Sequence, residues 1–494
     1  MKIKLIRILG LCAGGRPGIL WPCLLLVVLP PVQAQSTDSV LRGSFWKNQG
    51  LTRVLPAWTD RGRSPDGLFY AELDRTWTPE DSTTLYPGMV ARHVFSYAAA
   101  YMMSGRESHL EQARRALGFM IEHGWDEEYG GWYNAVRPSG KVVDAEKDLF
   151  MQTYAATGLA LYWIVTREER ARTYLDRTRR FMNEHAWDDQ HGGYVDVLRR
   201  DGSVKEARKD FSPQLAPVSG YLLYLYSATR DTTYLRKAER ILDLTLTHMR
   251  DERGWILERF SRDWTFRPDD GKNSHINVGH NLEVAWLLLR LYDLTGTPSY
   301  RRTGLALTDQ LLDRAFQPDS GAWRSKLRRT NPDQYPPTTT WWVQAYGNFL
   351  QLYAYHVTGE QRYLDAFRAG ARFWSRHFVD AEHGGTVLRA HLSGGVADGA
   401  KAVRTKTSYH ALEHALLGYL YVDLWVNETP VTVHYRIEEP RGNRLFPLPI
   451  EALSPTIERV RLNGTAQSPP DTVDHALRLP SRGPASLTLE VAPN

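Results

Sequence analysis

Gly130-Gly131-Trp132-Tyr133 is the clearest copy of a short glycine–aromatic marker that recurs along this chain of 494 residues. Similar markers begin at Gly67, Gly192, Gly254, Gly321 and Gly384. Successive copies are 63, 62, 62, 67 and 63 residues apart, and such a constant period indicates a repeated supersecondary unit. Because glycine tolerates a positive φ, we expect the markers to form tight hairpins or helix caps with a structural role.

Two helical patterns lie between successive markers. The clearest pairs are residues 94–101 with 110–121, 154–165 with 174–182, and 282–294 with 300–312. Apolar residues recur in them at i, i+3, i+4 and i+7. The first segment of each pair is almost wholly apolar, whereas the second places charges such as Arg114 and Arg179 on one face. Six such pairs predict an all-α fold, a closed (α/α)6 barrel of inner and outer helices.

The sequence pattern changes after Pro430. Residues 431–437 alternate between apolar and polar side chains, and Asn463-Gly464 is typical of a hairpin turn. Further strand-like runs are residues 457–462, 476–479 and 487–491. We therefore expect a small C-terminal all-β appendage, which covers the barrel or binds a partner.

The first 34 residues have the features of a secretory signal peptide. A basic start at Lys2 and Lys4 is followed by the apolar run 19–32 and by small residues that end at Ala34. Cleavage after Ala34 predicts export to the periplasm or the extracellular space, and the alternative is an uncleaved membrane anchor. The predicted domains are a signal peptide (1–34), an (α/α)6 barrel (35–428) and a β-rich domain (429–494).

Charge and cysteine content exclude several classes of function. Cleavage after Ala34 would remove four of the 61 basic residues and none of the 56 acidic ones, which leaves 57 basic and 56 acidic residues. This balance indicates no nucleic-acid partner. Both cysteines lie in the signal segment, so the mature chain has no disulfide, thiolate nucleophile or cysteine metal site. No phosphate loop, dinucleotide fingerprint, zincin helix or nucleophile elbow occurs, and we expect neither a metal nor an organic cofactor.

Two of the predicted inner helices begin with a histidine followed three residues later by a glutamate. The pairs are His280 with Glu283 and His410 with Glu413, and side chains at this spacing share a helix face. We interpret Glu283 as the carboxylate that orients His280, the alternative being a capping histidine beside a solvated glutamate. Both imidazoles are expected at the same rim of the barrel. His414 is interpreted as a neutral core residue.

Aromatic and cationic side chains open two further inner helices. Trp341 and Trp342 are adjacent and cannot share one helix face, so we expect at most one of them to stack on a ligand. Arg92 enters the first inner helix. It is either an ion-pair partner or a cation that holds an anionic oxygen at the rim.

These motifs resemble those of the N-acylglucosamine 2-epimerase and cellobiose 2-epimerase superfamily over roughly residues 45–425. The matching positions are Arg92, His280, Glu283, Trp341, Trp342, Gln344, Ala345, Tyr409 and His410. The resemblance implies an (α/α)6 barrel and an enzyme that epimerises a sugar at C2 or interconverts an aldose and a ketose.

The resemblance is incomplete among the residues that would surround a substrate. Tyr346 stands where the family commonly has Glu, and Glu413 where it often has Arg. The other departures are Val90, Phe150, residues 212–217 including Ser212 and Ala216, and Thr405. The resemblance therefore implies the fold, but not the standard substrates of these epimerases.

The family resemblance also implies a mechanism that uses two histidines. One imidazole removes the proton at C2 of the open-chain sugar to give an enediolate, and the other returns a proton to the opposite face. We expect His280 and His410 to be this pair, with Arg92 stabilising the enediolate oxygen. The expected substrate-binding residues are Trp341, Trp342, Gln344, Tyr346, Tyr409 and Glu413.

Two other functions remain open from the sequence. An exported glycoside hydrolase on the same barrel would use a pair of carboxylates, with Glu283 and Glu413 as the obvious candidates. A non-catalytic oligosaccharide-binding protein would explain the altered substrate shell and the β appendage. In each case we expect a small carbohydrate ligand, no nucleic acid and no membrane contact after cleavage, and a homodimer is left open.

Overall fold

The computed structural model describes residues 38–81, 83–331, 333–439, 444–446, 456–468, 476–479 and 483–493. The predicted signal peptide, its cleavage after Ala34 and both cysteines lie outside the described residues. Residues 38–494 form one compact unit. Among the described residues, every helix is too short or too polar to cross a lipid bilayer.

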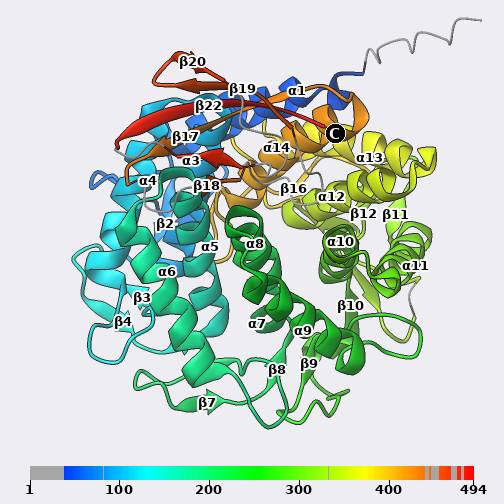
Figure 1. Cartoon of the computed structure of the whole chain (residues 1–494). Coiled ribbons are helices and arrows are strands. Elements are labelled where there is room, and N and C mark those ends of the chain that lie inside the picture. Colours follow the sequence, from blue (N-terminus) through cyan, green and yellow to red (C-terminus); the bar gives the residue numbers. More distant parts are fainter. Residues whose placement is uncertain are drawn as a thin grey trace, which may run out of the picture. The chain divides into compact units, whose positions relative to one another are not determined.

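Six buried helical segments form the inside of this unit. They are α3 (Pro87–Ser104), α5 (Leu149–Thr166), α7 (Phe211–Pro217) continuing through a π-helical turn (Val218–Leu222) into α8 (Leu223–Thr229), α10 (Val278–Thr295), α12 (Trp341–Thr358) and α14 (Tyr409–Tyr421). Most positions of these helices are buried, and most of the buried residues are apolar, as expected for helices in the interior of a large protein. Each contacts the next, and α14 contacts α3, which makes the inner helices a closed series of neighbours (Figure 1).

A second set of helices packs outside the first. They are α1 (Gly43–Asn48) and α2 (Leu55–Asp60), α4 (Glu107–Phe119), α6 (Glu169–Phe181), α9 (Thr232–His248), α11 (Pro298–Ala315) and α13 (Gln361–Phe373). These helices are amphipathic: α6 buries Ala171, Leu175 and Phe181 on one face. The outer partner of α14 is α1, so the start of the chain pairs with the last inner helix.

Short strands form hairpins between the helices. They are β1 (Glu72–Leu73), β2 (Pro79–Asp81), β3 (Ala135–Val136), β4 (Val142–Asp144), β5 (Lys147–Asp148), β6 (Val197–Leu198), β7 (Val204–Glu206), β8 (Lys209–Asp210), β9 (Arg259–Phe260), β10 (His275–Asn277), β11 (Phe316–Gln317), β12 (Ala322–Trp323), β13 (Lys326–Arg328), β14 (Thr338–Thr340), β15 (Arg389–His391) and β16 (Val396–Asp398). The marker glycines adopt positive φ, 74° at Gly131 and 76° at Gly193, which confirms the predicted turns.

An amide side chain from an inner helix holds the hairpin before it. Gln152 accepts a hydrogen bond from the N–H of Trp132 at 2.8 Å and donates to its carbonyl at 2.7 Å. Gln214 makes the same pair of bonds with Tyr194, at 2.8 and 2.7 Å. Because each bond satisfies a buried backbone group, the hairpins are anchored to the inner helices rather than lying loosely over them.

Ion pairs join each hairpin to the next one. The carboxylate of Asp126 accepts from Lys147 of its own repeat at 3.2 Å and from Arg200 of the following repeat at 2.9 Å. The same arrangement recurs among Asp188, Lys209 and Arg262. Although burial alone would raise it, the pKa of Asp126 is held below its ordinary value by its hydrogen bonds with Arg200 and Lys147.

An equivalent set of ion pairs joins the last hairpin to the first one. Asp380 accepts from Lys401 at 2.7 Å within its own repeat and from Arg75 at 3.0 Å. Arg75 lies 305 positions earlier in the chain, in the connection between β1 and β2. This contact connects the two ends of the repeat array.

The chain after the last inner helix forms strands. They are β17 (Val431–Ile437), β18 (Arg444–Leu445), β19 (Thr456–Leu462), β20 (Thr465–Gln467), β21 (Leu477–Arg478) and β22 (Ala485–Ala492). Four of them make an antiparallel sheet in the order β17-β22-β19-β20, and β17 lies beside α3 (Figure 1). Helical structure ends at Val426, and β17 begins at Val431. The predicted boundary at 428/429 falls between them and stays a prediction.

Candidate active site

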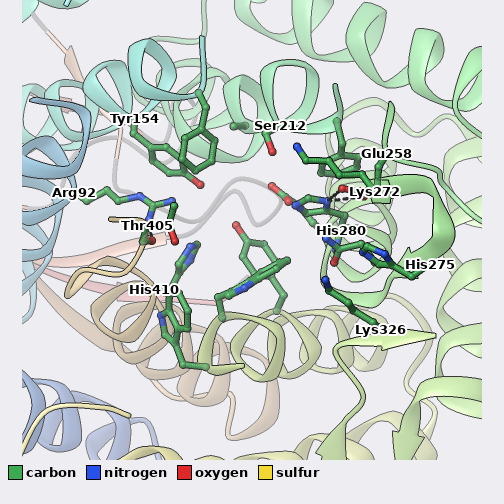
Figure 2. Close-up of a pocket in the computed structure, with 18 residues that line it drawn as sticks. Arg92, Tyr154, Ser212, Glu258, Lys272, His275, His280, Lys326, Thr405 and His410 are labelled. Carbon is green, nitrogen blue, oxygen red and sulfur yellow. Dashed lines mark hydrogen bonds and ion pairs between the residues drawn. The ribbon is translucent and has the colours of Figure 1, made fainter. Parts of the chain in front are cut away.

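A cavity of about 310 Å3 lies at the N-terminal ends of the inner helices (Figure 2). Its lining comes from six helix ends and from the hairpins between them: Arg92, Phe150, Tyr154, Phe211, Ser212, Ala216, Glu258, Lys272, His275, Asn277, His280, Glu283, Lys326, Trp341, Trp342, Tyr346, Thr405 and His410. The predicted residues Arg92, His280, Glu283, Trp341, Trp342, Tyr346 and His410 are therefore together in one cavity. Gln344, Tyr409 and Glu413 are not part of this lining.

His280 is oriented by a carboxylate from a neighbouring hairpin. Its Nδ1 lies 2.7 Å from Oε1 and 3.0 Å from Oε2 of Glu258, and the ring of Phe211 stacks on it with centroids 4.0 Å apart. With Nδ1 engaged, Nε2 is the nitrogen left for a ligand. The predicted orienting role of Glu283 is corrected. The carboxylate of Glu283 lines the same cavity, whereas Glu258 holds the imidazole ring of His280.

Glu258 was missed because it is distant from His280 in the sequence. It lies 22 positions earlier, just before β9, in the hairpin of the fourth glycine marker. The signal that could have found it is the repeat itself. Polar residues Asn134 and Asp196 occupy the corresponding positions in two earlier hairpins, so a polar side chain recurs at this position.

His410 is buried against a second glutamate. Its Nδ1 lies 3.3 Å from Oε2 of Glu413, and Oε1 of Glu413 accepts a hydrogen bond from the hydroxyl of Tyr409 at 2.9 Å. Burial and the nearby Arg92 hold the pKa of His410 well below its ordinary value, so the imidazole is uncharged at neutral pH. Tyr409 and Glu413 lie behind His410. The prediction that they bind substrate is therefore replaced by a role in holding the ring.

The two histidines face the cavity from opposite sides, as Figure 2 shows. The indole of Trp342 lies between them, with ring centroids 5.3 Å from His280 and 6.3 Å from His410. Trp341 also lines the cavity, but it is only 4% exposed and packs edge-on to His410 at 6.0 Å. Trp342 is the more exposed ring, and it offers the larger surface for stacking.

Arg92 supplies a buried cation on the His410 side of the cavity. Its guanidinium lies 3.5 Å from the centroid of the Tyr154 ring, and Nη1 donates to the carbonyl of Thr405 at 2.6 Å. Among the described residues, Nε of Arg92 has no hydrogen-bond partner. A buried guanidinium with unused donors is suited to an oxygen that acquires negative charge.

Gln344 has a structural position instead of the predicted contact with substrate. It is fully buried, accepts from the N–H of Trp323 at 3.1 Å and donates to the carbonyls of Gly321 and Gly370 at 2.9 and 3.1 Å. This is the hairpin clamp that Gln152 makes in an earlier repeat. The amide therefore serves the backbone of the barrel wall.

His414 is the neutral core residue that was predicted. Its Nε2 lies 3.1 Å from Nδ2 of Asn348, and the rings of Trp46 and Trp374 pack on it. Burial lowers its pKa to about 3, so it carries no charge at neutral pH.

Most positions at which the sequence departs from the epimerase pattern line this cavity. They are Phe150, Ser212, Ala216, Tyr346 and Thr405. The departures thus change the walls around the two histidines and leave the histidines themselves in place.

Comparison with known proteins shows the family. The family model for N-acylglucosamine 2-epimerase (GlcNAc 2-epimerase) matches residues 67–414, which include Arg92, His280 and His410. The chain belongs to the N-acylglucosamine 2-epimerase family. As a member of that family it is a sugar epimerase or isomerase.

Relatives of this family member have related activities. A cellobiose 2-epimerase of Bacteroides fragilis is 26% identical over 398 residues, which cover 76% of this chain and 97% of the relative. A D-mannose isomerase of Pseudomonas cannabina pv. alisalensis is 23% identical over 313 residues, 59% of this chain and 72% of the relative.

Solved structures give the same result for the fold. Cellobiose 2-epimerase from Bacillus thermoamylovorans B4167 has a TM-score of 0.70 at 19% identity and covers 76% of this chain and 98% of its own. A family 76 glycoside hydrolase from a bovine Bacteroides thetaiotaomicron strain is more distant. Its TM-score is 0.54 at 13% identity, over 80% of this chain and 79% of its own. The fold of this N-acylglucosamine 2-epimerase family member is thus closer to the epimerase than to the hydrolase.

Proposed function

We propose that this family member, on a closed (α/α)6 barrel, epimerises a reducing sugar at C2 or isomerises it to the ketose by proton transfer between His280 and His410. The observation that carries the proposal is the placement of two imidazoles on opposite sides of one cavity, each held through Nδ1 by a glutamate. Epimerisation needs this arrangement, because the proton leaves one face of C2 and returns to the other.

The uncharged His410 accepts the C2 proton, and the electron pair moves into an enediolate. Arg92 lies on the same side and stabilises the developing oxyanion. In this direction His280 begins as the imidazolium, which Glu258 stabilises, and delivers its Nε2 proton to the opposite face of C2, which inverts the configuration. Delivery to C1 instead, with the proton of the O2 hydroxyl passing to O1, would give the ketose.

The hydrolase alternative has lost its proposed pair of carboxylates. Glu413 lies behind His410 and outside the cavity lining, so Glu283 and Glu413 do not face a common bond. Glu258, which does line the cavity, is occupied by His280.

The direct test incubates the protein with reducing mono- and disaccharides in heavy water. Epimerisation predicts deuterium at C2 and isomerisation to the ketose predicts it at C1, with the number of sugar units unchanged in both cases. Release of shorter sugars would show hydrolysis, and saturable binding without exchange would show a binding protein.

Replacing either histidine tests the assignment of the two bases. His280→Asn and His410→Asn should each lower the turnover by about 10²–10⁴-fold, the contribution of one general acid–base group. His414→Asn is the control for a histidine on the same helix that is outside the cavity, with circular dichroism to check folding. Near-normal turnover in both single variants of the cavity histidines would refute the mechanism.

A further inference from the structure

A second, open groove of about 760 Å3 continues from the active-site cavity. His275 and Lys326 line both hollows, so the two are contiguous. In Figure 2, Lys272, His275 and Lys326 lie on the His280 side, opposite Arg92. If the reducing carbon lies between the histidines, the remainder of a longer sugar leaves through this opening.

A two-stranded antiparallel sheet determines which side chains face the groove. β10 and β13 pair with His275 opposite Arg328 and Asn277 opposite Lys326. Directly opposed residues share a face of an antiparallel pair, so these four side chains lie on one face. Between them, Ile276 and Leu327 are completely buried.

The groove carries cationic side chains and has no acidic residue in its described lining. Lys326, Arg328 and Arg329 line it. Neither Lys326 nor Arg328 forms an ion pair with any residue that the structure describes, and both are exposed. The Nε of Arg329 donates to the carbonyl of Asn273 at 3.1 Å, and its guanidinium lies 5.1 Å from the centroid of the Phe266 ring.

An aromatic platform accompanies these cations. The ring of Tyr335 is 36% exposed in the groove wall, and the guanidinium of Arg324 lies 3.7 Å from its centroid on one side. A supported ring beside unpaired cations suits a sugar ring that carries a negative charge.

We infer that the substrate is an acidic disaccharide or oligosaccharide, whose reducing sugar enters the cavity and whose next sugar presents a carboxylate or sulfate ester to Lys326 and Arg328. This inference rests on the proposed function, because it takes the reducing end to lie between His280 and His410. The altered cavity wall at Phe150 and Thr405 fits a substrate different from those of the neutral-sugar relatives.

The test compares three matched disaccharides: one of two neutral hexoses, one with a uronate as the non-reducing sugar, and one with a sulfate ester there. We expect kcat/KM for one of the charged forms to exceed that for the neutral form about fivefold at low ionic strength, and the preference to disappear at high salt. The two charged arms distinguish a carboxylate site from a sulfate site.

Arg328→Gln should reduce the preference for the charged sugar by at least about twofold. Arg180→Gln, which removes an exposed arginine from α6 on the outer surface, is the matched control and should leave the preference unchanged. Equal kcat/KM for the neutral and charged forms in the wild type, or an unchanged preference in Arg328→Gln, would overturn the inference.

Binding provides a readout that does not depend on turnover. Titration calorimetry on the full-length His410→Asn variant should show tighter binding of the charged disaccharide, by about the same fivefold ratio. If no sugar exchanges deuterium but this ratio is found, the proposed function fails and the groove assignment stands. If exchange occurs and the affinities are equal, the groove assignment fails and the proposed function stands.

Discussion

His280 and His410 present the same nitrogen to the cavity in different surroundings. Each Nδ1 is engaged by a glutamate, which leaves each Nε2 for the substrate. The side chain of His280 is 17% exposed and His410 is 7% exposed beside Arg92. Burial and Arg92 lower the pKa of His410, so its ring is uncharged in the resting enzyme and its Nε2 can accept the substrate proton.

Glu258 should act as a positioning residue for His280. Glu258→Gln keeps the size of the side chain but removes the charge that holds the ring, so we expect kcat to fall about 10–100-fold while KM changes little. Deuterium exchange at C2 measures both constants. Glu111→Gln, at an exposed position of α4, is the control. A rise in KM with unchanged kcat would contradict the positioning role.

Glu413 makes stability depend on pH. Burial raises its pKa from 4.5 to about 8, whereas in the unfolded chain it ionises near 4.5. The folded state therefore binds more protons above pH 4.5, and the stability associated with this group is lost as pH rises toward 8. The groups that face it are Tyr409, Glu283, Arg290, Arg92 and His410.

Glu413→Gln isolates this effect because glutamine does not ionise. Relative to the variant, the free energy of unfolding of the wild type should fall with pH, by up to about 1.4 kcal/mol per pH unit between pH 5 and 8. Urea denaturation at a series of pH values measures this difference. Two parallel curves would show that the carboxyl is ionised throughout that range.

At the scale of elements, each hairpin depends on the inner helix that follows it. Gln344 of α12 holds the backbone at Trp323 as Gln152 of α5 holds it at Trp132. A glutamine of the inner helix therefore anchors the preceding hairpin in both of these repeats. In the motif that resembles the sugar epimerases, Gln344 therefore supports the barrel wall.

Gln344→Met should therefore destabilise the protein without changing substrate affinity. The variant leaves the N–H of Trp323 and the carbonyl of Gly321 buried and unpaired, at a cost of about 1–3 kcal/mol for each group. Thermal unfolding should show a lower Tm, while KM of the folded enzyme stays the same. Gln152→Met is the matched variant in another repeat. A large rise in KM for Gln344→Met alone would return this residue to the binding site.

At the scale of the whole molecule, the contact of Asp380 with Arg75 and Lys401 connects the last hairpin to the first. Lys401 is completely buried, so its charge depends on Asp380. The side chain of Arg75 is 37% exposed and has a second partner in Glu382. The three side chains therefore differ in how much each supports closure.

Asp380→Asn should lower the free energy of unfolding by about 3–5 kcal/mol, because it leaves Lys401 buried without its carboxylate. Arg75→Gln should cost about 1 kcal/mol or less, since solvent screens this partly exposed pair. Asp126→Asn is the internal control and should match Asp380→Asn in urea denaturation. A much smaller loss for Asp380→Asn than for Asp126→Asn would contradict the dependence of the buried Lys401 on this carboxylate.

Sequence periodicity predicted the helices and the common location of the two histidines. The 62- to 67-residue repeat and the apolar spacing depend on neighbours within one helix or hairpin, and α5 and α10 follow them. Since His280 and His410 both begin inner helices, their helical positions alone bring them to the same end of the fold.

Only the tertiary structure decided which group holds His280, whereas the i+3 spacing already placed Glu413 beside His410. The i+3 spacing suggested Glu283 as the partner of His280, yet a hairpin 22 positions away supplies Glu258. Gln344 lies in the motif that resembles the sugar epimerases, but its side chain accepts a hydrogen bond from the backbone of the barrel wall. The physical reason is that helical periodicity determines only which face of the helix a side chain lies on. A hydrogen bond also requires a second backbone segment to be placed to within a fraction of an ångström. Packing between repeats sets that distance.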